Sequence, residues 1–314
     1  MKRVSVGSWA FTFGPHAEEP LSLPETVRRV AEAGYQGLEL SGFPPHASPA
    51  DYPTAAKRRT LRQLIEDAGL AISGYAADLT TTCPARPRNR ARYLERFEQA
   101  AEFAADVGAP FIRVDTVAAP GSIPEEGLPA AMDAIAECWH EAAGRAQQLG
   151  LRLVWEFEPG FLFNKPSEII ELHEKVRHPN FYLLFDTAHA YMSSVVGARH
   201  QGQAETLRRG LPQMLDLCAG RIGAVHVIDS DGSLYNDETS RHTPFGLGEI
   251  DFEAIAPTLR SLPGIDWLTV DLSFCRDRDQ WLQACREYVE ALLEGPGVGG
   301  REPGRNPAAT SGIR

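Results

Sequence analysis

The chain has 314 residues, of which 43% are hydrophobic and 23% are charged, which is the balance of a globular protein with a substantial core. It carries 31 basic and 42 acidic residues, giving a net charge of −11 at pH 7, whereas nucleic-acid-binding proteins usually show an excess or a stripe of basic residues. The sequence contains neither the apolar run of roughly 20 residues that a membrane span needs nor a signal peptide with a cleavage site. These features predict a cytoplasmic protein that binds neither nucleic acid nor membranes.

Short apolar runs alternate with helical patterns along the chain. The predicted strands are 4–8, 37–40, 71–75, 111–114, 151–156, 182–186, 222–228 and 267–271. Most of these runs are continuously apolar, which is typical of parallel strands buried on both faces. The predicted helices are 25–33, 54–68, 91–107, 128–149, 167–176, 204–218, 252–261 and 279–293. The alternation predicts an α/β fold, a single (β/α)8 TIM barrel over residues 1–293, rather than an open doubly wound sheet.

Glycines recur where a predicted helix gives way to the next strand. Gly34, Gly69, Gly108 and Gly150 stand at such junctions, as expected for residues that end a helix in the left-handed conformation. No GxGxxG motif follows the first strand, which disfavours a dinucleotide-binding domain. Residues 294–314 are rich in Gly and Pro and show no apolar periodicity, so we predict a disordered tail there. The five cysteines are scattered without a CxxC pair, which predicts neither a disulfide framework nor a thiolate zinc site.

The predicted strand-to-helix connections are longer than the helix-to-strand ones. Residues 9–23, 41–53, 76–90 and 229–250 form the longest, and in such a barrel they all emerge at the C-terminal end of the strands, where active sites lie. Trp9, Phe13 and Phe43 are therefore candidates for the wall of a pocket, and Phe11 belongs to the same group. We predict that the histidines at 16 and 46 are solvated.

Four consecutive strands end on a residue that can bind a metal or carry a proton. They are Glu156, Asp186, His226 and Asp271. Charged groups on buried strands are unfavourable unless they are paired or bind a cation, and strand ends on one side of a barrel converge on one centre. Three carboxylates and one imidazole suit one divalent ion, with Mn²⁺ or Mg²⁺ favoured and Co²⁺ or Zn²⁺ also compatible.

Two assignments near this centre have alternatives. Glu158 competes with Glu156 because residues two apart on a strand share a face, but Glu156 closes the apolar run and is preferred. Arg113 lies within a predicted strand, where it can form an ion pair in the barrel interior with Glu39 or Asp115.

Four motifs, in this order, resemble the xylose isomerase-like barrels of the sugar phosphate isomerase/epimerase family. They are E-x-x-P-G from Glu156, F-D-T-x-H ending at His189, H-x-x-D from His226 and H-x-P-x-G-x-G from His242. The resemblance covers roughly residues 1–293 and implies that Glu156, Asp186 and His226 bind metal while His189 faces the substrate. The family usually has a glutamate at the end of strand eight, whereas this chain has Asp271, which is one methylene shorter.

The resemblance and the predicted site together indicate a metal-dependent isomerase or epimerase acting on a sugar or polyol ketone. A divalent ion would polarise the carbonyl and stabilise the enediolate that forms when the α-proton is removed. We expect catalytic roles for Glu156 as ligand and base, for Asp271 as ligand and second acid/base, and for His189 as a hydrogen-bond donor. Trp9, His189, Arg241 and His242 are the expected substrate contacts. Family members often form homodimers or homotetramers, and these are the candidate assemblies.

Three other functions share parts of this pattern. A dehydratase or lyase of the same family, resembling inosose dehydratases or enzymes that eliminate from keto sugars, would begin with the same proton abstraction. An apurinic-site endonuclease shares F-D-T-x-H, but it needs histidines on strands three and four that this chain lacks. A non-catalytic carbohydrate-binding barrel would fit if the exchange to aspartate at position 271 marks a decayed site.

Overall fold

A computed structural model of the chain describes residues 2–295. Of the disordered tail predicted at 294–314, residues 296–314 lie outside the described part. Glu294, the first residue of that predicted tail, is instead the last residue of a helix.

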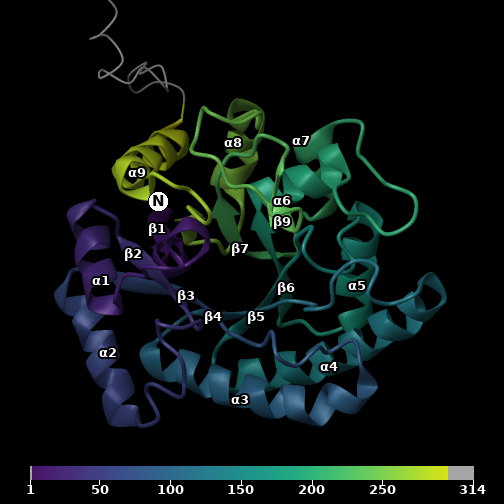
Figure 1. The fold of residues 1–314 in the computed structure, drawn as a ribbon, viewed down its shortest axis with the longest axis horizontal. Helices are drawn as coiled ribbons and strands as arrows, with labels where there is room; N and C mark the ends of the chain where they lie inside the picture. Colours follow the sequence, from purple (N-terminus) through teal and green to yellow (C-terminus); the bar gives the residue numbers. More distant parts are fainter. Residues whose placement is uncertain (1, 296–314) are drawn as a thin grey trace, which may run out of the picture.

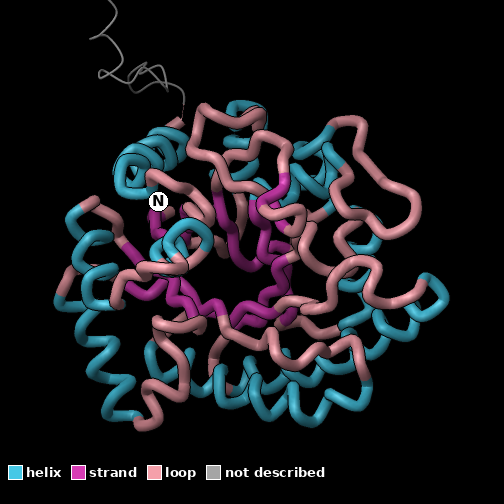
Figure 2. Tube along the Cα trace, viewed as in Figure 1, coloured by secondary structure: helices cyan, strands magenta, loops and turns pink. Residues whose placement is uncertain are grey.

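Eight parallel strands of the described chain close into a barrel, which confirms the predicted TIM-barrel fold (Figures 1 and 2). Around the barrel they follow the order β1-β10-β7-β6-β5-β4-β3-β2. The strands are β1 (Arg3–Gly7), β2 (Gly37–Ser41), β3 (Ala71–Ala76), β4 (Phe111–Val114), β5 (Arg152–Glu156), β6 (Phe181–Asp186), β7 (Ile222–Val227) and β10 (Trp267–Val270). Each lies within one or two residues of its predicted range, because a strand buried on both faces has an apolar sequence from end to end.

Helices surround the barrel, and the loops at the carboxyl ends of the strands form its mouth (Figure 2). The outer helices are α1 (Leu23–Glu32), α2 (Ala55–Asp67), α3 (Arg90–Val107), α4 (Leu128–Gln148), α5 (Pro166–Val176), α7 (Gly210–Leu217), α8 (Phe252–Ser261) and α9 (Arg278–Glu294). Their apolar sides pack on the strands in one continuous core. The helix-ending role of the junction glycines is confirmed; Gly108, for example, has φ of 85° and its N–H bonds to the carbonyls of Ala104 and Ala105.

The segment after β6 differs from the prediction. The predicted helix 204–218 begins only at Gly210, and an unpredicted short helix, α6 (Thr187–Tyr191), follows the strand directly and continues as a π-helix, Met192–Val196. Asp186 caps α6, because its Oδ1 accepts a hydrogen bond of 2.9 Å from the backbone N–H of His189. A residue expected to bind metal therefore also begins a helix.

The prediction that His46 is solvated is wrong. Its ring is buried and contacts Ser8 Oγ at 3.1 Å and the carbonyl oxygen of Leu21 at 3.1 Å. The loop after β2 therefore packs against the segment between β1 and α1, and the ring of His46 also lies 3.4 Å from Thr26 Oγ1 in α1. His16, by contrast, is half-buried and one ring nitrogen lies 3.0 Å from the carbonyl oxygen of Cys275.

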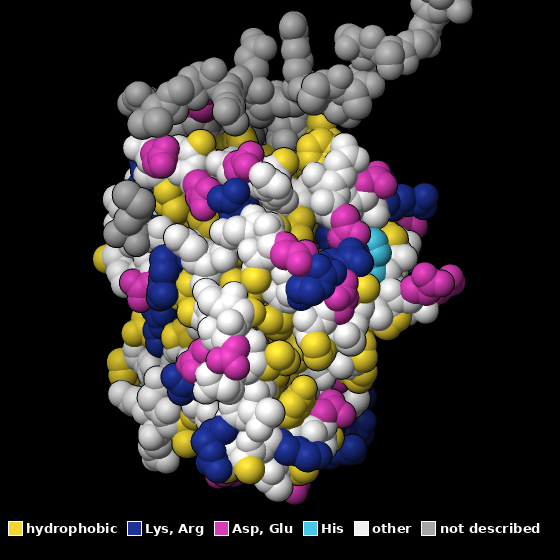
Figure 3. Space-filling view, turned by 90° about the vertical axis from the view of Figure 1, so that its left-hand side faces the viewer, with side chains coloured by type: hydrophobic (Ala, Val, Ile, Leu, Met, Phe, Trp, Pro, Cys, Tyr) yellow, Lys and Arg dark blue, Asp and Glu magenta, His cyan; other side chains and the backbone are white. Residues whose placement is uncertain are grey.

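Acidic and basic side chains are intermixed on the face that carries α1 and α2 (Figure 3). On α1, Arg28 pairs with Glu25 at 2.7 Å and with Glu32 at 2.5 Å, at helical spacings of three and four residues. Within residues 2–295, none of the helices combines the length and the apolar character that crossing a bilayer requires.

Candidate metal centre

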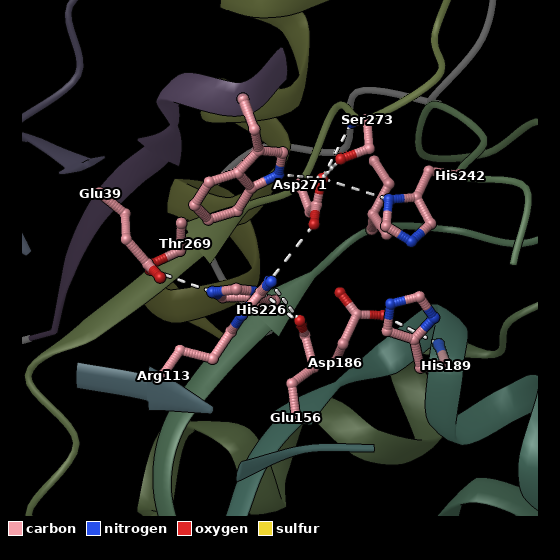
Figure 4. Close-up of polar contacts among 12 residues, drawn as sticks. Glu39, Arg113, Glu156, Asp186, His189, His226, His242, Thr269, Asp271 and Ser273 are labelled. Atoms are coloured by element: carbon pink, nitrogen blue, oxygen red, sulfur yellow. Dashed lines mark hydrogen bonds and ion pairs between the residues drawn. The ribbon is translucent and has the colours of Figure 1, made fainter. Parts of the chain in front are cut away.

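The four predicted ligands converge at the mouth of the barrel. Glu156 and Asp186 end β5 and β6, His226 lies near the end of β7, and Asp271 follows β10. One ligand atom of each lies within 4.8 Å of the others, and all four residues are buried. The close-up in Figure 4 shows their side chains pointing toward one another. The sequence expectation that consecutive strand ends meet is therefore realised in space.

This cluster has the electrostatic character of a cation site. Oδ2 of Asp186 is buried, and no residue of the described chain donates a hydrogen bond to it. Burial, together with the nearby carboxylates of Asp271 and Glu156, raises the pKa of Asp186. Because an unpaired buried carboxylate is costly, a divalent ion held by these oxygens and by the imidazole of His226 fits the donor set.

His226 is held between two carboxylates. Its Nδ1 lies 3.0 Å from Glu156 Oε1 and 3.9 Å from Asp271 Oδ2, and its Nε2 lies 3.0 Å from Glu39 Oε2. Burial alone would lower the pKa of His226, but Glu39 and Glu156 raise it well above its ordinary value. Nδ1 is thus the nitrogen that faces the candidate metal centre.

Arg113 holds the second oxygen of Glu156. Its Nη1 donates to Glu156 Oε2 at 2.5 Å, and its Nη2 lies 3.3 Å from Asp115 Oδ2. Burial would raise the pKa of Glu156, but Arg113 and His226 lower it to about 2. Burial also raises the pKa of Asp115 to about 7 despite the same arginine. Of the two partners considered for Arg113, the structure shows Asp115 and not Glu39.

One oxygen of Asp271 is saturated with donors. Its Oδ1 accepts from Trp9 Nε1 at 2.8 Å and from Ser273 through N at 2.8 Å and Oγ at 2.5 Å. His242 Nδ1 lies 3.2 Å from the same oxygen. Burial would raise the pKa of Asp271, but His242 and the other donors hold it well below its usual range. Only Oδ2 remains directed at the cluster.

Two histidines complete the wall above Asp186. His189 Nδ1 lies 2.8 Å from Ser240 Oγ, and its Nε2 lies 3.9 Å from Glu158 Oε2. The rings of His189 and His242 are 5.1 Å apart, and both lie close enough to Asp186 to form a second group of potential ligands. Burial would lower the pKa of His242, but Asp271 and Asp186 raise it to about 9.

A cavity of about 350 Å³ opens above the cluster. It is lined by Glu156 and Asp271 at its base and by aromatic rings higher up; these are Trp9, Phe13, Phe43, Phe161 and Phe274. The predicted substrate contacts Trp9, His189 and His242 line it, whereas Arg241 is exposed and lines a neighbouring cavity instead. The prediction that Phe11 belongs to the pocket wall is wrong, because its side chain is fully buried in the core.

A hairpin in the loop after β7 brings residues to this cavity. Its strands are β8 (Leu234–Tyr235) and β9 (Thr239–Ser240), and Thr239 donates a short hydrogen bond to Glu158. Glu158, the alternative to Glu156 as a ligand, lines the cavity without joining the four-residue cluster.

Asp229 explains the spacing of two of the sequence motifs. Its Oδ1 accepts the N–H groups of Ser230 and Ile250, and its Oδ2 accepts those of Gly246 and Gly248. A Cβ at Gly248 would lie 2.3 Å from Oδ1 of Asp229, so this close approach requires glycine. The aspartate of H-x-x-D therefore closes the loop that carries H-x-P-x-G-x-G.

Sequence reasoning missed Glu39, Thr269 and Ser273 as parts of this site. The sequence suggests Glu39 only as a partner for Arg113, although it is the one charged residue in the predicted strand 37–40. A single charged residue in a buried strand was the signal that could have identified Glu39 as part of the site. Its partner, His226, could not be identified because the two strands are not neighbours in the barrel.

Comparison with known proteins places the chain in a family. The model of the xylose isomerase-like TIM barrel family matches residues 27–291, so the chain belongs to this family. No curated protein sequence matches it.

Solved structures with the same fold include a sugar epimerase, an epimerase-like protein and a probable dehydratase. A D-tagatose 3-epimerase-like protein is 20% identical with a TM-score of 0.70, over 93% of this chain and 97% of that one. A D-psicose 3-epimerase from Clostridium cellulolyticum H10 is 13% identical with a TM-score of 0.68, over 93% and 99%. The probable 3-DHS dehydratase from Bacillus anthracis involved in petrobactin synthesis is 17% identical with a TM-score of 0.67, over 93% and 99%. At these identities the likeness concerns the fold.

Proposed function

We propose that this protein is a divalent-metal-dependent isomerase or epimerase of a sugar or polyol ketone. The observation that carries the proposal is the buried cluster of Glu156, Asp186, His226 and Asp271 at the base of a cavity large enough for a small carbohydrate. The sugar epimerases among the structures of the same fold support this substrate class. The acidic net charge gives no attraction toward nucleic acid.

The residues fit one divalent ion, with Mn²⁺ the preferred candidate. Three carboxylates and one imidazole are ligands that Mn²⁺ and Mg²⁺ accept, and the unpartnered Oδ2 of Asp186 is a free donor atom. A bound divalent ion supplies Lewis-acid polarisation of a substrate carbonyl and stabilises the negative charge that develops on its oxygen.

Glu156 is the candidate base. Arg113 and His226 lower its pKa to about 2, so the carboxylate is ionised at neutral pH and is in the form that can accept a proton. Because a carboxylate with so low a pKa is a weak base, removal of the α-proton would depend on a bound metal ion that acidifies the ketone. Arg113 fixes Oε2, which orients the carboxylate and leaves Oε1 toward the cluster. His189 stands at the cavity wall, where its Nε2 can donate to a substrate oxygen.

Asp271 fits the role of ligand better than that of a second acid/base. Three hydrogen-bond donors occupy Oδ1, and its pKa is held low, so returning a proton from this carboxylate is unfavourable. This observation favours a second candidate, a dehydratase or lyase, in which the intermediate loses a β-hydroxyl and no proton returns to the α-carbon. The dehydratase of the same fold supports that candidate.

The test is proton exchange with solvent. The purified protein, stripped of metal and then supplied with Mn²⁺, is incubated with a panel of ketoses and keto-polyols in D₂O and followed by NMR and mass spectrometry. Deuterium at an α-carbon of a product that has not lost water supports an isomerase or epimerase, and loss of water supports the lyase. Binding of a carbohydrate with neither change would assign the chain to the non-catalytic carbohydrate-binding class.

Glu158→Gln is the matched control for Glu156→Gln. Both residues line the cavity, but only Glu156 belongs to the cluster. We expect Glu156→Gln to abolish exchange and Glu158→Gln to retain a measurable rate. The reverse ranking would contradict the assignment of the base.

A further inference from the structure

We propose that Glu39 is a positioning residue that fixes the orientation of His226 from behind and so presents Nδ1 to the metal. This inference rests on the metal site of the proposed function. Glu39 has no exposed surface, although it is a carboxylate in the middle of the barrel. A charged group in such a place requires a compensating partner, and His226 is that partner.

The contact crosses the interior of the barrel. Glu39 comes from β2 and His226 from β7, two strands that are not neighbours. Glu39 Oε2 lies 3.0 Å from His226 Nε2 and also accepts a hydrogen bond of 3.1 Å from Thr269 Oγ1. Thr269 is the residue of β10 directly beside His226 in the sheet, and its hydroxyl lies 2.9 Å from Ser5 Oγ. Glu39 from β2 and Thr269 from β10 thus build the support behind the imidazole of His226.

The chemistry of the two groups determines the orientation. Glu39 Oε2 is already the acceptor for the hydroxyl of Thr269, so the nitrogen of His226 that faces the same oxygen is placed to donate a hydrogen to it. In a neutral imidazole the other nitrogen then has the free lone pair. That nitrogen is Nδ1, which faces Glu156 and Asp271 in the candidate metal centre (Figure 4).

The surroundings of the ring favour this single arrangement. Trp9 covers one side of the imidazole, with ring centroids 5.3 Å apart. In Figure 4, Glu39 lies on the far side of His226 from Glu156 and Asp271. Hydrogen-bonded carboxylates behind a metal-binding histidine typically contribute 10–100-fold to metal affinity, because they hold the ring and raise its basicity.

Metal affinity is the first test. Mn²⁺ binding to the chelator-stripped full chain is measured by isothermal titration calorimetry for the wild type, Glu39→Gln and Ser5→Ala. Ser5→Ala is the matched control, because the hydroxyl of Ser5 hydrogen-bonds to Thr269 and, within the described chain, to neither Glu39 nor His226. We expect Glu39→Gln to weaken binding about 10–100-fold and Ser5→Ala to leave it nearly unchanged. Equal Mn²⁺ affinity of Glu39→Gln and the wild type would overturn the inference.

The tautomer of His226 is the second test, and it needs no variant at position 39. Two-bond ¹H–¹⁵N correlation spectra of the Zn²⁺-loaded wild type, assigned with His226→Gln, should show hydrogen on Nε2 and metal on Nδ1. The opposite tautomer would overturn the role of Glu39, even if Glu39→Gln fails to fold. Failure of the wild type to bind Mn²⁺ or Zn²⁺ would overturn the metal site itself and the inference with it. Metal binding without any effect of Glu39 would overturn the inference alone.

Discussion

Asp186→Asn should make the metal-free protein more stable while removing its response to metal. The buried Oδ2 of Asp186 has no hydrogen-bond donor among the described residues, and an unsatisfied buried polar group costs about 1–3 kcal/mol. Asparagine keeps the Oδ1 that caps α6 and replaces the other oxygen by an amide that can donate to Glu156 or Asp271. The free energy of unfolding of the metal-free chain should therefore rise by about 1–3 kcal/mol, or roughly 2–6 °C in melting temperature.

Added Mn²⁺ should stabilise the wild type but not Asp186→Asn. At a concentration of 100 times its dissociation constant, Mn²⁺ should stabilise the wild type by about 2.7 kcal/mol, a shift of about 5 °C. Asp186→Asn should show little or none of this shift. Differential scanning calorimetry with EDTA and with Mn²⁺ measures both quantities in one pair of scans.

Asp229→Asn is the matched control, because it makes the same change at another buried aspartate. Each oxygen of Asp229 accepts two backbone N–H groups, so an amide in place of either oxygen loses two hydrogen bonds. We expect this variant to lose at least about 2 kcal/mol of stability and to keep the Mn²⁺ shift. The reasoning is refuted if metal-free Asp186→Asn melts below the wild type, or if it retains the full response to Mn²⁺.

Three further predictions concern other parts of the chain. Burial lowers the pKa of His46 from 6.5 to about 4, so the stability that the neutral ring contributes is complete above pH 6.5 and is lost as the pH falls toward 4. Urea unfolding at pH 7.5 and 4.5 should show that the free energy of unfolding falls by roughly 2–3 kcal/mol less in His46→Gln than in the wild type. Equal falls in the two proteins would contradict the assignment. Trp9→Phe removes one hydrogen-bond donor from Asp271 and should weaken Mn²⁺ binding several-fold in calorimetry, while the circular dichroism spectrum stays unchanged. An unchanged Mn²⁺ affinity would show that this hydrogen bond does not orient the carboxylate of Asp271. Gly248→Ala forces a Cβ against Asp229 and should lower the free energy of unfolding by about 1–3 kcal/mol in urea titrations, and a neutral result would show that the loop can shift.

The fold could be predicted from the sequence because each element has a local signal. Continuous apolar runs marked the strands, and glycines such as Gly34 and Gly150 marked the helix ends with φ of 81° and 75°. The prediction was wrong between β6 and α7, where the segment Thr187–Tyr191 is too short to show helical periodicity. That helix depends on the cap by Asp186, which cannot be recognised from apolar spacing.

The site was predictable to the extent that it depends on strand ends. The proximity of Glu156 and His226 follows from parallel strands that end on one side of a closed barrel. Contacts across the interior, such as Glu39 with His226, depend on which strands face each other, and a single sequence does not contain that information. The burial of His46 depends in the same way on a loop that folds back onto α1. The catalytic, substrate and metal roles of these residues stay predictions.

The carboxylate of Asp229 ties together both ends of the loop that follows β7. The backbone of Thr243 bonds to Asp229 at 2.9 Å and that of Glu249 bonds to Ser230 at 2.7 Å, which closes a narrow neck below the β8–β9 hairpin. The base of the loop is thus held by backbone bonds and by Asp229, and the hairpin itself is held by the side chains of Thr239 and Ser240, which bond to Glu158 and His189. A change at the other hairpin positions, 234–238, therefore leaves both sets of contacts in place, because neither the base of the loop nor the two side-chain bonds involve those residues.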